Sequence, residues 1–251
     1  MILLALAKGM ILMRNRGTKM SKTLQNWIDE DKETFQGRQG SIREALVDLK
    51  TGMLNSVSDK NKEEVFYMLC FCLLVSQSKQ LYVEELIDQL KELNFYKDGI
   101  PDDKLRKMLS RKVRFHNRKT DRLLAAREKF KGVFWETLKK KSAEYHAASG
   151  KGRTRVLLYV RNWLMKEING IGLKLSSHFA RNIGMRGLAI LDVHVLRAME
   201  ERGQISDCSA LTRDRYYGIE QKVKKYAKLV GISLDELDQL FWSNATGYVG
   251  K

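Results

Sequence analysis

The stretch that decides the fold is Lys166–Arg197, with the sequence KEINGIGLKLSSHFARNIGMRGLAILDVHVLR. Just before its glycines, apolar residues recur at spacings of three and four, which places their side chains on one face of a helix; these residues are Leu157, Val160, Leu164 and Ile168. We expect this helix to end at Asn169-Gly170 and a second helix to begin near Leu173. The stretch is therefore predicted to form a helical hairpin.

Two glycines, Gly170 and Gly172, flank Ile171 in the predicted hairpin loop. Glycine permits sharp turns and close approach of the backbone to a partner because it has no Cβ. The first amides of the second helix have no partners within that helix and carry the positive end of its dipole, so they can bind a DNA phosphate. Glycine pairs also serve helix packing. The loop alone is therefore compatible with DNA binding or with packing.

Lys174 and Asp192 are the two chemically interesting residues of this stretch. Lys174 falls in the first turn of the second helix, where the dipole and apolar neighbours disfavour the ammonium form and favour a nucleophilic amine. Asp192 follows 18 residues later, after an apolar run, and is expected to cap the next helix. Taken separately, each has an ordinary alternative, a phosphate contact for Lys174 and a purely structural cap for Asp192.

Together, G-I-G-L-K followed by L-D-V-H resembles the active-site signature of the helix-hairpin-helix DNA glycosylases that have a built-in lyase activity. The 18-residue spacing, the chain length and the ending FWSNATGYVGK are most similar to the archaeal-type (type 2) 8-oxoguanine DNA glycosylases. The resemblance extends over roughly Glu63 to Lys251. It implies that Lys174 forms a Schiff base with the sugar and that Asp192 stabilises the charge that develops there.

The resemblance also assigns roles in base and DNA recognition. It implies that Phe115 and Trp242 stack on the extruded base and that the terminal Lys251 helps to identify a guanine derivative. The expected DNA contacts are Gln77, Gly170, Gly172, Arg114 and His116. Without the resemblance, Trp242 is an ordinary core aromatic, Lys251 a frayed terminus and Gln77 a polar helix end.

Composition points to a polyanionic partner. The 251 residues include 46 Lys and Arg against 30 Asp and Glu, a formal net charge of +16, which favours nucleic acid. A membrane surface is disfavoured, because no basic amphipathic helix stands apart from the fold. The three cysteines and four histidines show neither a disulfide framework nor iron-sulfur or zinc spacing. We expect a reduced intracellular environment and no metal or organic cofactor.

Helical patterns dominate the whole chain, so the predicted fold class is all-α, with two helical subdomains and the active site in the cleft between them. Residues 1–40 are expected to be an appended N-terminal segment, because residues 20–40 are polar and lie outside the family resemblance. A capping box at Ser41 and Glu44 predicts the next helix start. The terminal subdomain is expected to comprise residues 41–80 and 188–251. The central subdomain, residues 81–187, is expected to contain the hairpin.

The predicted function is bifunctional: excision of 8-oxoguanine from double-stranded DNA, and strand cleavage by β-elimination. Two alternatives remain within nucleic-acid binding: a cluster-less relative acting on oxidised pyrimidines or abasic sites, and a non-catalytic helix-hairpin-helix module. A third hypothesis, a basic structural or ribosome-associated protein, accounts for the net charge but not for the motif. We expect a monomer without membrane attachment, located in the cytoplasm at the nucleoid.

Overall fold

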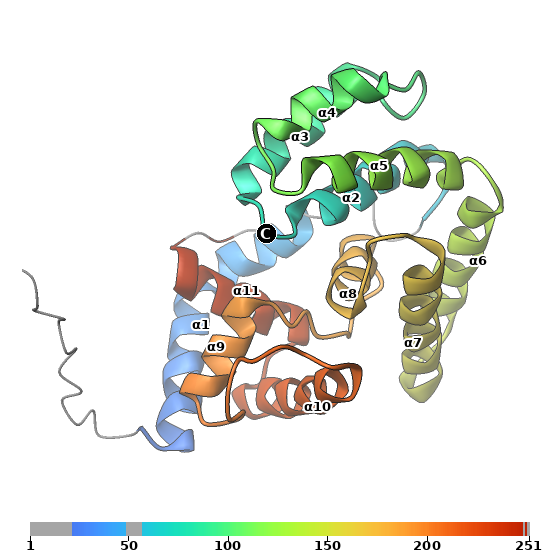
Figure 1. The fold of residues 1–251 in the computed structure, drawn as a ribbon. Coiled ribbons are helices and arrows are strands. Elements are labelled where there is room, and N and C mark those ends of the chain that lie inside the picture. The colour runs from blue at the N-terminus through green and yellow to red at the C-terminus, as the bar shows by residue number, and fades with distance from the viewer. Residues whose placement is uncertain (1–21, 49–56, 248, 250–251) are drawn as a thin grey trace, which may run out of the picture.

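The computed structural model describes residues 22–48, 57–247 and 249, and within these ranges it contains helices and no strands. The prediction of an all-α fold is confirmed (Figure 1). A short 3-10 helix, η1 (Asp59–Asn61), accompanies the α-helices, which are α1 (Leu24–Asp48), α2 (Lys62–Val75), α3 (Gln80–Glu92), α4 (Asp102–Ser110), α5 (His116–Phe130), α6 (Val133–Ala147), α7 (Gly150–Glu167), α8 (Leu173–Asn182), α9 (Val193–Glu201), α10 (Arg213–Val230) and α11 (Leu234–Thr246).

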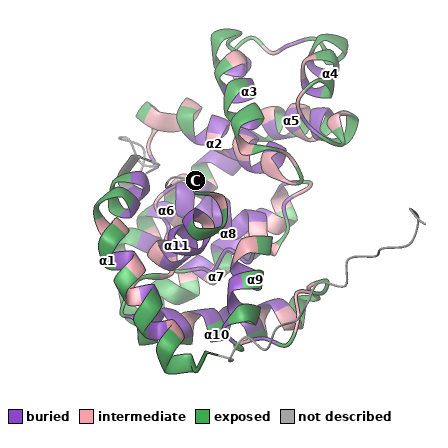
Figure 2. Ribbon diagram, turned by 90° about the vertical axis from the view of Figure 1, so that its left-hand side faces the viewer, coloured by how far each residue is buried: buried purple, intermediate pink, exposed green. Residues whose placement is uncertain are grey.

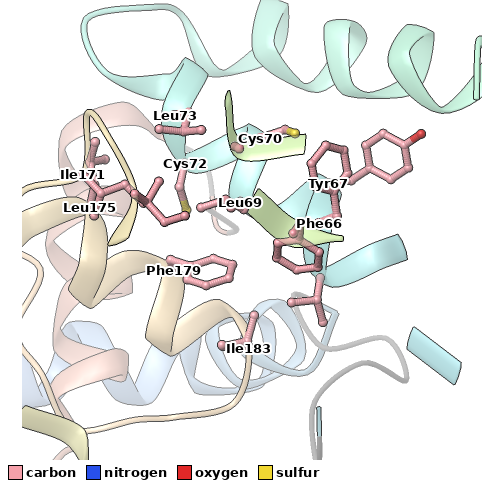
Figure 3. Close-up of a cluster of buried hydrophobic side chains, with 14 of the residues drawn as sticks. Phe66, Tyr67, Leu69, Cys70, Cys72, Leu73, Ile171, Leu175, Phe179 and Ile183 are labelled. Carbon is pink, nitrogen blue, oxygen red and sulfur yellow. The ribbon is translucent and has the colours of Figure 1, made fainter. Parts of the chain in front are cut away.

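A first hydrophobic cluster is built around α2 and collects buried side chains from α2 to α8. The apolar run from Val65 to Val75 predicts a helix buried on all sides, and this prediction is confirmed. Figure 3 shows side chains of α2, among them Leu69 and Cys72, beside Leu175 and Phe179 of α8. The hairpin helix α8 is therefore held against the centre of this cluster.

A second hydrophobic cluster joins α1, α9, α10 and α11. It includes residues 189 and 191 of the segment that connects α8 to α9, whereas Leu188 belongs to the first cluster. The chain therefore crosses from one cluster to the other between Leu188 and Ala189. In Figure 1, α8 lies between the group α2–α5 and the group α1, α9–α11. We refer below to the contact region of the two clusters as the seam.

The composition of the two clusters differs in one respect from the expected division. That division placed residues 41–80 with the C-terminal residues, but α2 packs in the first cluster together with α3–α8. The reason is its uniformly apolar surface, which buries side chains against several central helices at once. The assignment of subdomains on this basis remains a prediction.

The predicted helix start at Ser41 is wrong, because α1 runs without a break from Leu24 to Asp48 and Ser41 lies inside it. Three buried apolar residues, Ile28, Phe35 and Ile42, lie seven residues apart and form one face of α1. Figure 2 shows buried positions along α1 alternating with exposed ones. Ile28 and Phe35, which fall within the expected appended segment, thus belong to the second cluster.

Candidate active site

The hairpin loop has the predicted form. Helix α7 ends at Glu167, and α8 begins at Leu173 with Gly172 as its N-cap. Gly170 has φ +91°, a left-handed conformation that favours glycine, and a Cβ there would lie 2.4 Å from Nε of Arg122. Gly172 has extended backbone angles, and a Cβ there would meet nothing within 4 Å. The fold therefore requires glycine at position 170, whereas at position 172 it leaves the space open.

Lys174 lies at the seam. Its neighbour Leu175 belongs to the first cluster, while its other neighbour Leu173 packs against the second. Its side chain is partly buried. On the α2 side, the charge of Lys174 acts on the thiol of Cys72: burial raises the pKa of Cys72 to about 12, and the positive charges of Arg181 and Lys174 partly oppose this increase.

Asp192 is the N-cap of α9, as predicted. Its Oδ1 accepts hydrogen bonds of 2.9 Å from the backbone amides of His194 and Val195. Two amides without helical partners thereby hold the carboxylate in a fixed orientation at the positive end of the helix. Because Leu191 and Val195 belong to the second cluster, Asp192 starts its helix beside the cluster that Leu173 contacts. The seam thus brings together the elements that carry Lys174 and Asp192.

Gln77 and Phe115 are placed on exposed turns at the α2–α5 end of the molecule. Both have left-handed backbone conformations, with φ +54° for Gln77 and +57° for Phe115. Such angles are uncommon for residues other than glycine and persist where the surroundings enforce them. Phe115 is the N-cap of α5, and 51% of its surface is exposed. An exposed aromatic ring on a constrained turn is suited to stacking, although its role here remains a prediction.

Lys119 connects these two turns. It lies in the first turn of α5, and its Nζ donates to the carbonyls of Leu74 and Ser76 and to Oγ of Ser78, at 2.6, 2.7 and 2.8 Å. Burial, assisted by the charge of Arg122, lowers the pKa of Lys119 to about 8. The three hydrogen bonds attach the turn that contains Gln77 to the helix that begins after Phe115.

The remaining expected site residues are spread over two regions. Arg114 is exposed, with its guanidinium carbon 5.4 Å from the centre of the Phe115 ring, and His116 is half-buried at the start of α5. Trp242 is half-buried on α11. Lys251 lies outside the described residues. Within the described ranges, no three His, Cys, Asp or Glu side chains are grouped so that they could bind a metal ion.

A family model described as 8-oxoguanine DNA glycosylase (Ogg-HhH) matches residues 47–232. This range contains the hairpin, Lys174 and Asp192. The chain belongs to the Ogg-HhH family. The resemblance seen in the sequence is thereby confirmed.

Individual proteins extend this match over most of the chain. An 8-oxoguanine DNA glycosylase/AP lyase of Fusobacterium nucleatum is 29% identical over 90% of this chain and 98% of its own length. The crystal structure of the 8-oxoguanine DNA glycosylase of Thermotoga maritima has the same fold, with a TM-score of 0.72, 23% identity and coverage of 91% and 100%. A Methanocaldococcus jannaschii 8-oxoguanine glycosylase/lyase, crystallised with a 15mer DNA containing 8-oxoguanine, gives a TM-score of 0.62 at 24% identity, with coverage of 90% and 93%.

Several buried polar residues of this Ogg-HhH chain were missed by the motif-based sequence analysis. Arg161 of α7 and Glu220 of α10 form a paired salt bridge at 2.9 and 3.2 Å, and Tyr216 of α10 bonds to the segment before Asp192. Arg181 of α8 contacts Asp238 of α11 at 2.6 Å. The only signal in the sequence is a charged residue at a position where the helical pattern expects an apolar one, and this signal does not identify the partner.

Among the described residues, no helix is long and apolar enough to cross a membrane.

Proposed function

We propose that this protein is an 8-oxoguanine DNA glycosylase and AP lyase that acts on double-stranded DNA in base excision repair. The observation that carries the proposal is the placement of Lys174 in the first turn of α8 at the seam, with Asp192 capping α9 beside the same cluster. The activity for which the family and the Fusobacterium nucleatum relative are named supports it. The Methanocaldococcus jannaschii complex supports damaged DNA as the partner. We expect an intracellular, nucleoid-associated monomer.

The first chemical step is loss of the damaged base. The target nucleotide must leave the duplex, at an unstacking cost of about a few kcal/mol, before its C1′ can be reached. As the bond between C1′ and the base breaks, the sugar acquires positive charge, and a fixed carboxylate stabilises that charge mainly in the transition state. Asp192 is suited to this role because two backbone amides orient it.

Lys174 provides the nucleophile for this displacement and carries the sugar through strand cleavage. Its neutral amine attacks C1′ as the base departs with the electron pair of the broken bond, and opening of the sugar ring then gives a Schiff base. Loss of a C2′ proton and departure of the 3′ phosphate break the strand by β-elimination. Asp192 also helps to remove the proton from Lys174. No step draws on an oxidant or reductant.

Recognition of the base requires more than stacking. Phe115 and Trp242 provide aromatic surfaces that hold any extruded purine, and Lys251 contributes to identifying a guanine derivative. 8-Oxoguanine differs from guanine by a proton on N7 and an oxygen on C8. A buried acceptor for the N7 proton discriminates between them, because it would face the lone pair of N7 in guanine.

The experiment that tests this proposal is borohydride trapping on four duplexes, which contain 8-oxoguanine, an abasic site, an oxidised pyrimidine or only normal bases. Borohydride reduces the Schiff base to a stable covalent adduct. We expect an adduct with the 8-oxoguanine duplex for the wild-type protein and for Lys104→Gln, an exposed lysine on α4. We expect loss of the adduct in Lys174→Gln.

The outcomes separate the alternatives. Trapping on the abasic site alone would retain the lyase and remove the base specificity. Trapping on the oxidised pyrimidine in place of 8-oxoguanine would identify the other substrate class. Tight DNA binding without any adduct would leave a non-catalytic binding module. Asp192→Asn is expected to bind DNA while excising the base at least about a hundredfold more slowly, the scale of losing one oriented electrostatic group.

A further inference from the structure

The extended segment between α8 and α9 is held by side chains of α10. Residues 188–192 belong to no helix. The amide of Ala189 donates to Glu220 at 3.0 Å, and its carbonyl accepts from the Tyr216 hydroxyl at 2.8 Å. The amide of Leu191 donates to the same hydroxyl at 3.4 Å. The backbone that leads into Asp192 is thus bonded at three points to two residues of one helix.

One of these two residues, Glu220, is also joined to α7, the first helix of the hairpin. Glu220 accepts both Nη groups of Arg161 of α7, and the two side chains are 1% and 0% exposed. A continuous chain of polar contacts therefore connects the hairpin to the segment that ends at Asp192.

The chemistry of these buried polar groups favours a fixed arrangement of α10 and the segment before Asp192. Burial raises the pKa of Tyr216 to about 12, so its hydroxyl keeps its proton and donates to Ala189 at every physiological pH. A buried ion pair such as Arg161–Glu220 has a large desolvation cost, and it is weak evidence for a role in stability alone. Its geometric value is that directional hydrogen bonds in a buried polar network favour one arrangement of the groups that they join.

We propose that Tyr216, supported by Glu220 and Arg161, is a positioning residue that sets the place of Asp192 relative to Lys174. The inference rests on the proposed roles of Lys174 and Asp192. Tyr216 reaches no reacting atom in this arrangement and acts through the backbone of residues 189–191. A small displacement of a carboxylate weakens its effect on a developing charge, so loss of the hydroxyl should slow base excision without weakening DNA binding.

The test compares Tyr216→Phe with Tyr226→Phe. Both tyrosines are buried on α10 and each hydroxyl makes a buried hydrogen bond, but the Tyr226 hydroxyl donates to Asp31 of α1 at 2.6 Å and not to the segment before Asp192. We expect Tyr216→Phe to excise 8-oxoguanine about tenfold more slowly in single turnover, at an unchanged Kd for the duplex. Tyr226→Phe should excise at the wild-type rate.

Hydrogen exchange supplies a readout that does not depend on activity. In Tyr216→Phe, the amides of Ala189 and Leu191 should exchange faster than in the wild-type protein, whereas in Tyr226→Phe they should not. An unchanged exchange rate, or equal excision rates for the two variants, would overturn the inference. If the wild-type protein excises no base, the proposed function fails, and the exchange comparison still decides whether Tyr216 holds the segment.

A milder variant covers the case in which Tyr216→Phe does not fold. Arg161→Lys keeps the buried positive charge and leaves the bonds of the Tyr216 hydroxyl to Ala189 and Leu191 in place, but its ammonium group cannot reproduce the paired hydrogen bonds of the guanidinium to Glu220. We expect it to slow single-turnover excision about threefold at an unchanged Kd. A wild-type rate for this variant, with wild-type exchange at residues 188–192, would equally overturn the inference.

Discussion

Gly170 and Gly172 stand two residues apart in the hairpin loop, but the fold constrains them differently. At Gly170 the left-handed backbone disfavours any residue with a Cβ, and the flexible side chain of Arg122 would have to move to make room for one. At Gly172 neither the backbone angles nor any neighbouring atom opposes a Cβ. If a glycine is needed at position 172, the reason must lie in a partner that approaches the loop, such as a DNA phosphate.

Gly172→Ala tests this difference. We expect its free energy of unfolding to remain within about 1 kcal/mol of wild type, since alanine is a poorer N-cap than glycine but also lowers the conformational entropy of the unfolded chain. We expect its Kd for duplex DNA to rise at least about tenfold, because the added methyl group holds the phosphate away from the first amides of α8. The measurements are thermal unfolding and a DNA-binding titration.

Gly170→Ala serves as the contrasting variant. It should lose about 1–3 kcal/mol of stability whether or not DNA approaches the loop, because its backbone is strained and its Cβ meets Arg122. Wild-type DNA binding by Gly172→Ala would show that the glycine pair serves helix packing, the alternative that the sequence leaves open.

At the residue level, what the sequence predicts depends on how local the signal is. The N-cap role of Asp192 could be predicted because it is decided by residues two and three positions away. The partners of Tyr216 could not be predicted, because Ala189 lies 27 residues away in sequence and no periodicity relates the two. Lys119 was missed for the same reason, since its acceptors lie more than 40 residues away.

At the level of elements, α1 shows how a helix can be misjudged. The capping-box pattern at Ser41 and Glu44 predicts a helix start, but Ser41 lies inside α1. The spacing of seven between Ile28, Phe35 and Ile42 was the stronger signal, because it describes one buried face across that boundary. By contrast, α2, α7, α8 and α10 carry apolar patterns that end at glycine or polar residues, and their existence was predicted correctly.

The two glycines inside α1 lead to a stability prediction. A Cβ at Gly37 or at Gly40 would meet nothing within 4 Å, and neither has a positive φ. Replacing each by alanine should therefore increase the free energy of unfolding by about 0.5–1 kcal/mol, because alanine loses less backbone entropy in a helix. Denaturant titration of Gly37→Ala, Gly40→Ala and the double variant measures the gain and its additivity.

The comparison for α1 is the same substitution at a glycine with positive φ. Gly231, the left-handed residue after α10, has φ +84°, and a Cβ there would meet no neighbouring atom. Gly231→Ala should therefore destabilise the protein through its backbone conformation alone, without a steric clash. If Gly37→Ala and Gly40→Ala also destabilise it, residues 37–40 do not form a regular helix in solution.

At the level of the whole molecule, the seam between the clusters is unusually rich in buried charge. Arg161 and Glu220 pair across α7 and α10, and Arg181 pairs with Asp238 across α8 and α11. Asp235 of α11 is also buried there, and its carboxyl feels the charges of Arg181 and Arg186. Charged contacts of this kind orient the two clusters while contributing little net stability. This agrees with a site in which the relative placement of the side chains matters more than the stability that their contacts contribute.

Asp235 makes the stability of the molecule depend on pH in a direction opposite to that of most carboxyl groups. Burial raises the pKa of Asp235 from 3.8 to about 6, although Arg181 and Arg186 oppose this. Between about pH 4 and pH 6 the folded protein therefore retains a proton that the unfolded chain has released. The free energy of unfolding contributed by this group falls as pH rises through that window, and the loss is complete above it.

Asp235→Asn should remove this loss. At pH 7 we expect the variant to be more stable than wild type by on the order of 2 kcal/mol, with the difference shrinking to nothing below about pH 4, where Asp235 is protonated in both states. Asp207→Asn is the control of opposite sign. Hydrogen bonds from Ser209 and Arg215 hold the pKa of Asp207 below its usual range, so this exposed carboxylate stabilises the fold at neutral pH. Denaturant unfolding at pH 4, 5, 6 and 7 gives the comparison. Equal stability of Asp235→Asn and wild type at pH 7 would show that the ionised Asp235 carboxylate does not destabilise the folded protein.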